Sequence, residues 1–476
     1  MRDLPLNTGP IHFLGIGGIG MSGIAEVMFG LGYKVQGSDA VENSNVMRLR
    51  KLGINITIGH HKKNIKGAEF LVVSSAVQKN NLEILEARKL NIPVVRRAEM
   101  LAELMRFKWS IAVGGTHGKT TTTSMISSVL DIAGLDPTVI NGGIIKAYST
   151  NARKGSGDWM VVEADESDGT FVKLHATATV VTNIDPEHLD FYKDFDSIKS
   201  AFKVFVENIP FYGFAAMCVD HPDVQSLCSQ IEERKIIKYG LNPNADISAE
   251  NIKVDSFGSV FDVILREPMY LPKKINQVKI KMPGKHNIQN ALAAFLVGIE
   301  LGIDFKTIVK GLELFSGVER RFSIIGSVND ITIIDDYAHH PVEIKAVLNA
   351  AKHVSKNKII AVVQPHRFSR LQSLFNDFCT CFNEADVVVV LDVYPAGEEP
   401  IVGFDRDRLV EGIRSHGHKN VISLQHEKEL PQTIAKISEP RDIVVCVGAG
   451  SISSWANVLP SKIKKILQYD LKEATL

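Results

Sequence analysis

The sequence has few cysteines, and those it has do not form a pattern. Its five cysteines are odd in number and scattered along 476 residues. Cys379 and Cys381 lie two apart, but no second pair completes a zinc site. We therefore expect ordinary reduced thiols, which are typical of proteins in the cytosol.

The sequence also lacks an excess of charge and any long apolar run. Lys and Arg total 54, and so do Asp and Glu, so no net field attracts nucleic acid or an anionic membrane. No run approaches the ~18 apolar residues of a membrane span, and the first residues include no apolar signal region. We expect a cytoplasmic protein with no nucleic-acid partner and no membrane insertion.

Strand-like and helix-like patterns alternate almost throughout, which indicates an α/β fold with largely parallel sheets. A chain of 476 residues favours about three domains. Apolar strands at 11–14, 110–113 and 331–334 each begin a new segment. These starts predict domains 1–108, 109–322 and 323–476. Shorter alternating stretches between residues 246 and 281 predict a small antiparallel insertion in the second domain.

The first glycine loop, Gly-Ile-Gly-Gly-Ile-Gly from Gly15 to Gly20, lies between an apolar strand and a helical pattern over 21–29. Its second glycine allows backbone N–H groups to approach a diphosphate, which the helix N-terminus also favours. Asp39 follows the next strand, where an acid commonly accepts a hydrogen bond from a ribose hydroxyl. The pattern fits NAD and UDP equally well, and glycines that serve only a tight turn are the plainer alternative.

The second glycine loop, Gly-Gly-Thr-His-Gly-Lys-Thr-Thr from Gly114 to Thr121, has the residue types that a Walker loop uses to bind phosphates. Backbone N–H groups surround phosphates, Lys119 adds positive charge, and the Thr120 hydroxyl is offered to Mg²⁺. Val113 stands where the general pattern requires the first glycine. Glu163, at the end of another apolar strand, could complete a site for a hard cation. Two loops of this kind argue for two different nucleotides.

The chain resembles the Mur ligase family along essentially its whole length. The shortened second loop carries the resemblance together with segments 15–21, 163–168, 283–291, 317–322, 335–341 and 364–370. It implies a Rossmann-like N-terminal domain that binds UDP, a central P-loop ATPase domain, and a Rossmann-like C-terminal domain that receives an amino acid. The motifs are most similar to members that use ATP to join L-alanine to the carboxylate of UDP-N-acetylmuramate, through an acyl phosphate, in peptidoglycan precursor synthesis.

The loops and the resemblance together assign the candidate site residues. The catalytic candidates are Lys119, His188 and Arg321, and the ligands of two expected Mg²⁺ ions are Thr120, Glu163 and His188. The ATP candidates are Gly114, Gly115, Thr116, His117, Gly118, Lys119, Thr120, Thr121, His286, Asn290, Arg321 and Asp336. The UDP-sugar candidates are Gly15, Gly17, Gly18, Gly20, Met21, Asp39, His60 and Ser75. The amino-acid candidates are Tyr337, His339, His366, Arg367 and Arg370.

For some of these residues, physical arguments support the assigned role or offer a plainer alternative. Arg367 and Arg370 are three apart, so on a helical turn they could share a face and bind a carboxylate through their guanidinium groups. For an isolated histidine such as His188 the default is a structural role, and a strand-end serine such as Ser75 is more often a local backbone cap. Adjacent Arg320 and Arg321 could equally be a solvated surface pair.

Other functions are compatible with parts of the sequence. A recycling ligase would attach a tripeptide to the same sugar nucleotide, and folate polyglutamate ligases share the ATP domain but lack the first glycine loop. An NAD-dependent dehydrogenase would leave Lys119, Thr120 and Glu163 without a use. A nucleotide-binding regulator would bind ATP without turnover. We expect a monomer or a weak homodimer.

Overall fold

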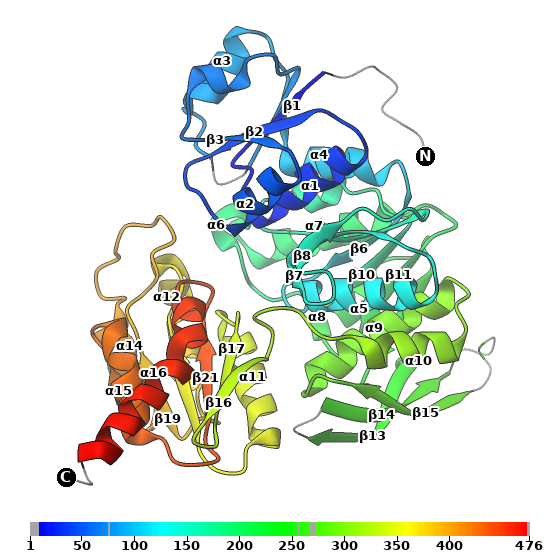
Figure 1. Ribbon diagram of the computed structural model, residues 1–476. Coiled ribbons are helices and arrows are strands. Elements are labelled where there is room, and N and C mark those ends of the chain that lie inside the picture. The colour runs from blue at the N-terminus through cyan, green and yellow to red at the C-terminus, as the bar shows by residue number, and fades with distance from the viewer. Residues whose placement is uncertain (1–8, 75–76, 256–257, 267–269, 271–272, 474–476) are drawn as a thin grey trace. The chain divides into compact units, whose positions relative to one another are not determined.

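The computed structural model describes residues 9–473 except 75–76, 256–257, 267–269 and 271–272. Its contacts form two compact units. The first comprises Met1–Ile252, Phe261–Ile280 and Ile288–Val318, and the second comprises Lys253–Val260, Lys281–Asn287 and Glu319–Leu476. The strands of the described residues form three β-sheets (Figure 1).

The first sheet has five parallel strands in the order β3-β2-β1-β4-β5. Its strands are β1 (Ile11–Leu14), β2 (Val35–Asp39), β3 (Asn55–Ile58), β4 (Phe70–Val73) and β5 (Val94–Arg96). Its helices are α1 (Ile19–Gly30), α2 (Ser44–Lys51), the 3₁₀ helix η1 (Lys62–Ile65), α3 (Leu82–Lys89) and α4 (Arg97–Met105). The strand order reverses between β1 and β4, and ligands of α/β sheets bind at the carboxyl end of such a point.

The second sheet has ten strands in the order β15-β14-β13-β12-β11-β10-β6-β9-β7-β8. The strands are β6 (Trp109–Gly114), β7 (Thr138–Ile145), β8 (Thr150–Arg153), β9 (Trp159–Glu163), β10 (Ala178–Val181), β11 (Phe214–Cys218), β12 (Ile236–Gly240), β13 (Ile247–Asp255), β14 (Gly258–Leu265) and β15 (Lys274–Ile280). The helices are α5 (Lys119–Ile132), η2 (Thr170–Lys173), α6 (Leu189–Tyr192), α7 (Phe195–Glu207), α8 (Pro222–Cys228), α9 (Lys285–Glu300) and α10 (Phe305–Leu314).

The stretch predicted as a small antiparallel insertion in the second domain extends this second sheet at one edge. Strand β13 pairs in parallel with β12, and β14 and β15 follow it in the strand order. At the other edge, helix α1 of the first sheet packs on β7 and β8. A Cβ atom on Gly23 of α1 would lie 3.0 Å from the Cβ atom of Ala152, so glycine permits this close approach. One buried apolar cluster therefore continues from α1 and α4 into the second sheet.

The third sheet has the order β16-β17-β21-β18-β19-β20, with β16 antiparallel to β17 and the other pairs parallel. Its strands are β16 (Ser323–Val328), β17 (Ile331–Asp336), β18 (Ile359–Val363), β19 (Val387–Val390), β20 (Val421–Ser423) and β21 (Ile443–Val447). Its helices are α11 (Pro341–Val354), α12 (Phe368–Ser373), α13 (Phe375–Thr380), α14 (Arg406–Ser415), η3 (Glu427–Glu429), α15 (Leu430–Ile437) and α16 (Ile452–Glu473).

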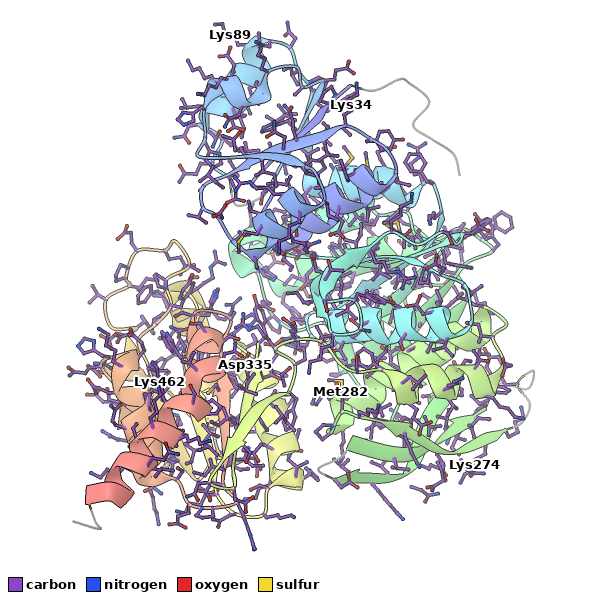
Figure 2. The ribbon with its side chains drawn as sticks, viewed as in Figure 1. Lys34, Lys89, Lys274, Met282, Asp335 and Lys462 are labelled. Atoms are coloured by element: carbon purple, nitrogen blue, oxygen red, sulfur yellow. The ribbon has the colours of Figure 1, made fainter. Side chains whose placement is uncertain are left out.

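The third sheet is covered on both faces, which explains its unbroken β-branched strands. Ile334 of β17 packs into an apolar cluster with α11 to α14, while Ile331 and Ile333 pack into another with α15 and α16. Asp335, which Figure 2 labels, is buried in β17 and accepts a hydrogen bond from Ser453 of α16. The predicted α/β class is confirmed, while the predicted boundaries at 108 and 323 stay a prediction.

The free cysteines agree with the expectation of unpaired thiols. Of the five cysteines, which are all free, Cys228 alone is half-buried and the others are buried. Within the described part of the chain, no helix combines the length and the apolar character needed to cross a membrane.

A fully buried carboxylate organises the first sheet. Glu83, in the first turn of α3, accepts hydrogen bonds from Ser38 Oγ at 2.8 Å and Asn64 Nδ2 at 2.8 Å. His12 Nε2 of β1 lies 2.9 Å from the same carboxylate. Burial alone would raise the pKa of Glu83, but hydrogen bonds from His12, Ser38 and Asn64 outweigh it and lower the pKa. Glu83 thereby ties α3 to β1, β2 and η1.

We predict that Glu83→Gln lowers the free energy of unfolding at neutral pH by roughly 1–3 kcal/mol, because an amide cannot accept all of these hydrogen bonds. The folded state lowers the pKa of Glu83, so the carboxylate stabilises the fold above the ordinary carboxyl pKa. That stability is lost as the pH falls through the folded pKa. Urea titrations of both proteins between acid and neutral pH measure the difference, which should shrink toward acid pH. Glu86→Gln, on the same helix, is the control, and equal losses from both variants would contradict the prediction.

Candidate active site

The second glycine loop lies where three parallel strands end side by side. Strand β6 lies between β10 and β9, with Gly114 opposite Val181 and Val113 opposite Glu163. The loop after β6 therefore lies between Glu163 and the residues that follow β10. Val113 is a buried residue of β6, so the position where a longer Walker loop has its first glycine is still strand here.

The two internal glycines of this loop are required by its backbone. Gly115 has φ +131°, and a Cβ atom there would lie 2.0 Å from Thr182 Oγ1. Gly118 has φ +84° and precedes α5. Asn183 holds the loop between them, because its side chain accepts from His117 N at 2.7 Å and donates to His117 O at 3.0 Å. The loop is thus fixed by residues that follow β10.

Lys119 and Glu166 form a nearly buried ion pair, with Nζ 2.8 Å from Oε2. Lys119 Nζ also donates to the carbonyl oxygens of Gly115 at 2.5 Å and Thr116 at 3.1 Å. Burial lowers the pKa of Lys119, but the carboxylates of Glu166 and Glu163 outweigh it and raise the pKa. Burial raises the pKa of Glu166 above the usual carboxyl range, against the pull of the Lys119 ammonium. The ammonium group stays charged at every physiological pH.

The predicted metal ligands lie at neighbouring strand ends. Glu163, the last residue of β9, accepts a hydrogen bond from Gly142 N at 2.8 Å. Thr120 is buried in the first turn of α5, and its carbonyl oxygen accepts from Asn141 Nδ2 at 3.3 Å. His188 has φ +56° and lies beside Glu166, with Nε2 3.9 Å from Oε1.

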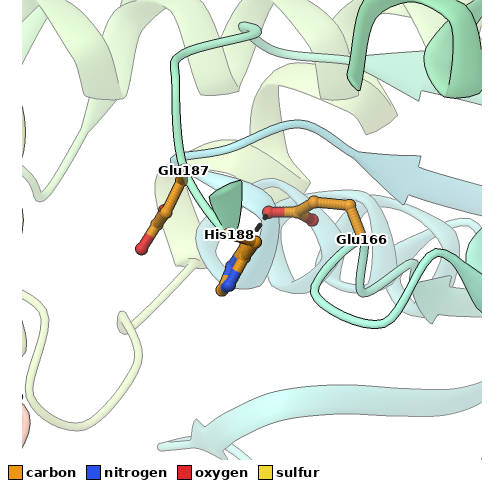
Figure 3. A group of neighbouring side chains, drawn as sticks. All are labelled: Glu166, Glu187 and His188. Carbon is orange, nitrogen blue, oxygen red and sulfur yellow. Dashed lines mark ion pairs between the residues drawn. The ribbon is translucent and has the colours of Figure 1, made fainter. Parts of the chain in front are cut away.

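The structure places two further carboxylates beside His188. Figure 3 shows Glu166, Glu187 and His188 together, and each offers a ligand atom within 4.8 Å of the others. Carboxylate oxygens are preferred ligands of Mg²⁺, and a neutral imidazole is an acceptable one. The donor set therefore fits a divalent cation.

The first glycine loop is held by Asp39. The Asp39 carboxylate is nearly buried and accepts a hydrogen bond from Gly17 N at 2.7 Å, so it fixes the loop in addition to any role toward a ribose. His60 Nδ1 lies 3.4 Å from Glu83 and 3.5 Å from Ser38 Oγ, at the end of the network around Glu83. Gly15, Gly18, Gly20 and Met21 lie in the same loop or the first turn of α1. Ser75 lies outside the described residues.

A pocket of about 210 Å³ connects this first loop to the second sheet. Gly18, Gly20 and Met21 line it from the first loop and α1, and Glu163 and Asp165 line it from the end of β9. The structure thus brings UDP-sugar candidates and a metal candidate to one cavity. Arg97 of α4 lines the same pocket.

The amino-acid candidates form one cluster in the second unit. The rings of Tyr337, His339, His366 and Tyr394 follow one another with centroids 5.3, 5.8 and 5.3 Å apart. Burial, aided by the charge of nearby groups, lowers the pKa of His366 to about 3, so this imidazole is neutral at physiological pH. Arg370 Nη1 donates to His366 O at 3.1 Å.

The two arginines of this cluster do not share a helical face as the spacing suggested. Arg367 precedes α12 with φ +72°, outside the helical region, and Arg370 lies within the helix. Arg367 Nε instead forms an ion pair at 2.8 Å with Glu398, which also accepts hydrogen bonds from the Ser369 side chain and backbone. Spacing alone could not show that the helix begins between the two residues.

The remaining ATP candidates are distributed between α9 and the start of the third sheet. Asn290 of α9 accepts from Thr122 Oγ1 at 3.0 Å. His286, one turn earlier, has its pKa lowered to about 4 by burial and by Arg321. The Asp336 carboxylate accepts hydrogen bonds from Phe322 N and Ala338 N, both at 2.7 Å. Burial raises the pKa of Asp336 to about 6.

Both arginines before β16 lie over one aromatic ring. The guanidinium carbons of Arg320 and Arg321 are 4.6 and 5.4 Å from the centre of the Tyr337 ring. Arg320 also donates to Gly448 O at 2.7 Å. These contacts argue against the alternative of a solvated surface pair.

Sequence reasoning missed Glu166, Asn183, Arg97 and Tyr394 as parts of the site. Glu166 stands inside segment 163–168, so the motif contained it, but no spacing rule pairs it with Lys119, 47 residues away. Asn183 and Arg97 act through contacts between different strands and helices. These residues are recognised only when the strand order is known.

Three family models match consecutive parts of the chain. The Mur ligase family, catalytic domain, matches residues 10–109, the Mur ligase middle domain matches 113–298, and the Mur ligase, glutamate ligase domain, matches 320–450. Together they span all three sheets.

Similar proteins extend over nearly the whole chain. The UDP-N-acetylmuramate–L-alanine ligase of Rhodospirillum rubrum is 59% identical over 98% of this chain and 97% of its own length. That of Rhodopseudomonas palustris is 60% identical over 97% of this chain and 99% of its own. The crystal structure of UDP-N-acetylmuramate-alanine ligase from Thermotoga maritima matches with a TM-score of 0.81 and 31% identity, over 96% of this chain and 99% of that one.

Proposed function

We propose that this chain, which belongs to the Mur ligase family, joins L-alanine to the carboxylate of UDP-N-acetylmuramate. It is an ATP-dependent, amide-forming ligase of peptidoglycan synthesis. The observation that carries this function is identity of about 60% to ligases of that activity, over 97% of both chains or more. The three substrates are UDP-N-acetylmuramate, L-alanine and ATP.

The reaction begins with two anions that repel each other. A substrate carboxylate oxygen attacks the γ-phosphorus of ATP, ADP leaves, and an acyl phosphate forms. Lys119 and the backbone N–H groups of the loop between Gly114 and Thr121 hold the phosphates. Thr120 and Glu163 would hold one Mg²⁺ and His188 a second, and these ions would offset the charge of the phosphates and of the carboxylate. Glu166 and Glu187, which lie beside His188, extend the oxygen donors available there.

Lys119 has an anionic partner within the protein itself. The Glu166 carboxylate 2.8 Å from Nζ occupies the kind of position that a phosphate oxygen takes. Entry of the ATP phosphates therefore exchanges one anionic partner of Lys119 for another. This exchange avoids leaving a buried ammonium without a partner.

The remaining candidates supply the two other binding sites and the adenosine contacts. The first glycine loop, Asp39 and His60 bind the UDP part of the sugar nucleotide. Asn290, His286 and Asp336 bind the adenosine part of ATP, and Arg321 stabilises the transferring phosphoryl group. The cluster of Tyr337, His339, His366, Arg367 and Arg370 receives L-alanine, whose carboxylate the guanidinium groups bind.

The protein acts in the cytoplasm as a monomer or a weak homodimer. ATP is a cytoplasmic nucleotide, and the described cysteines are free rather than paired.

We predict that the purified protein releases phosphate when given ATP, Mg²⁺, UDP-N-acetylmuramate and L-alanine. Lys119→Ala should lower the rate by about 100-fold or more, because the transition-state charge loses its nearest cation. A coupled phosphate assay measures both rates. Replacing L-alanine with a tripeptide distinguishes the recycling ligase, and faster turnover with the tripeptide would refute the proposed acceptor.

We predict that removing Mg²⁺ with a chelator abolishes phosphate release. His188→Ala should raise the Mg²⁺ concentration for half-maximal rate about tenfold or more, because one metal ligand is lost. The rate is measured across a Mg²⁺ titration. His175→Ala, an exposed histidine before β10, is the matched control, and an unchanged titration for His188→Ala would exclude His188 as a ligand.

A further inference from the structure

Arg97 is a nearly buried cation that the proposed function leaves without a role. It is the first residue of α4, and its side chain is 13% exposed. Its Nη2 donates to Asp165 Oδ2 at 2.9 Å. A Cβ atom on Gly20 would lie 3.1 Å from Arg97 Nη1, so the guanidinium lies directly beside the first turn of α1. Arg97 thus lies between the first glycine loop and the end of β9.

The pocket around Arg97 has one cationic side chain among its described lining residues, and that is Arg97 itself. Among the described residues that line it, Glu163 and Asp165 are acidic and Arg97 alone is basic. A diphosphate that enters this pocket meets two carboxylates, whose repulsion in a partly buried site is large unless a cation offsets it. Asp165 accepts a hydrogen bond from one of the five N–H groups of the Arg97 guanidinium. The other four N–H groups point in fixed directions around the planar guanidinium.

We propose that Arg97 binds the diphosphate of the sugar nucleotide, with Asp165 holding one edge of its guanidinium. The inference rests on the proposed function, which places UDP-N-acetylmuramate in this pocket. The contact with Gly20 favours the diphosphate over the sugar's carboxylate, because the loop from Gly15 to Gly20 and the start of α1 attract that same group.

The test compares three nucleotides on the full-length protein by calorimetry. UDP carries the diphosphate, UDP-N-acetylglucosamine adds a sugar, and UDP-N-acetylmuramate adds the carboxylate. Arg97→Met should weaken binding of all three by the same factor, about 10- to 100-fold, because a charge-assisted contact from the guanidinium is lost. Arg97→Lys keeps the charge without the fork and should lose less. The KM for ATP should stay unchanged.

Arg106→Met is the matched control, because Arg106 follows α4 and forms an exposed ion pair with Glu103. It should bind all three nucleotides as the wild type does. Weakening of UDP-N-acetylmuramate alone would mean that Arg97 binds the carboxylate, and unchanged UDP binding in both Arg97 variants would remove Arg97 from the site. Either result overturns the inference. Failure of the wild-type protein to bind UDP-N-acetylmuramate would instead overturn the proposed function.

Discussion

The ion pair between Lys119 and Glu166 is the interaction on which the proposed ATP site depends. The Lys119 ammonium donates hydrogen bonds to two carbonyl oxygens of the loop after β6. Its ionic partner, Glu166, belongs to the segment after β9. The Glu166 carbonyl oxygen accepts a hydrogen bond from Tyr192 Oη at 2.7 Å, which adds the segment after β10. A nearly buried ammonium is stable only with an anionic partner. The pair therefore keeps three strand ends together and reserves a position for an anion.

A cation paired with a carboxylate also occurs in the two other places where we expect anionic substrates. Arg97 is held by Asp165 at 2.9 Å in the pocket of the first loop, and Arg367 is held by Glu398 at 2.8 Å beside the aromatic cluster. Each cation is fixed by a carboxylate of its own unit, which lowers the conformational entropy lost on binding. We match the diphosphate of the sugar nucleotide to Arg97, the triphosphate of ATP to Lys119, and the carboxylate of the amino acid to Arg367.

Much of the fold was predictable because buried parallel strands have long β-branched runs. Strand β1 has the predicted residues, and β6 and β17 contain the strands predicted at 110–113 and 331–334. Both glycine loops lie between a strand and a helix, as the motifs required. The first strand of the third sheet, β16, was missed, because polar and glycine residues such as Ser327 and Gly326 interrupt its apolar residues. The start of α12 between Arg367 and Arg370 was missed because it depends on a backbone conformation rather than on spacing.

The site was predictable where a motif is contiguous and not where it depends on strand order. Lys119 and Thr120 follow from one loop, whereas Glu166 and Asn183 meet that loop only because β9 and β10 flank β6. Asp39 was expected to face a ribose, and its bond to Gly17 N could not be foreseen without the loop's conformation. The resemblance to a family supplied roles for residues of the third sheet that spacing alone could not assign.

The central claim is that ATP is used to activate a carboxylate before the amine attacks. Its most direct test uses UDP-N-acetylmuramate labelled with ¹⁸O in both carboxylate oxygens. If an acyl phosphate forms, the amine displaces phosphate that contains one former carboxylate oxygen. Mass spectrometry of the released phosphate should then show one ¹⁸O atom for each turnover, with the other retained in the amide. Phosphate without ¹⁸O, released together with amide product, would contradict the account.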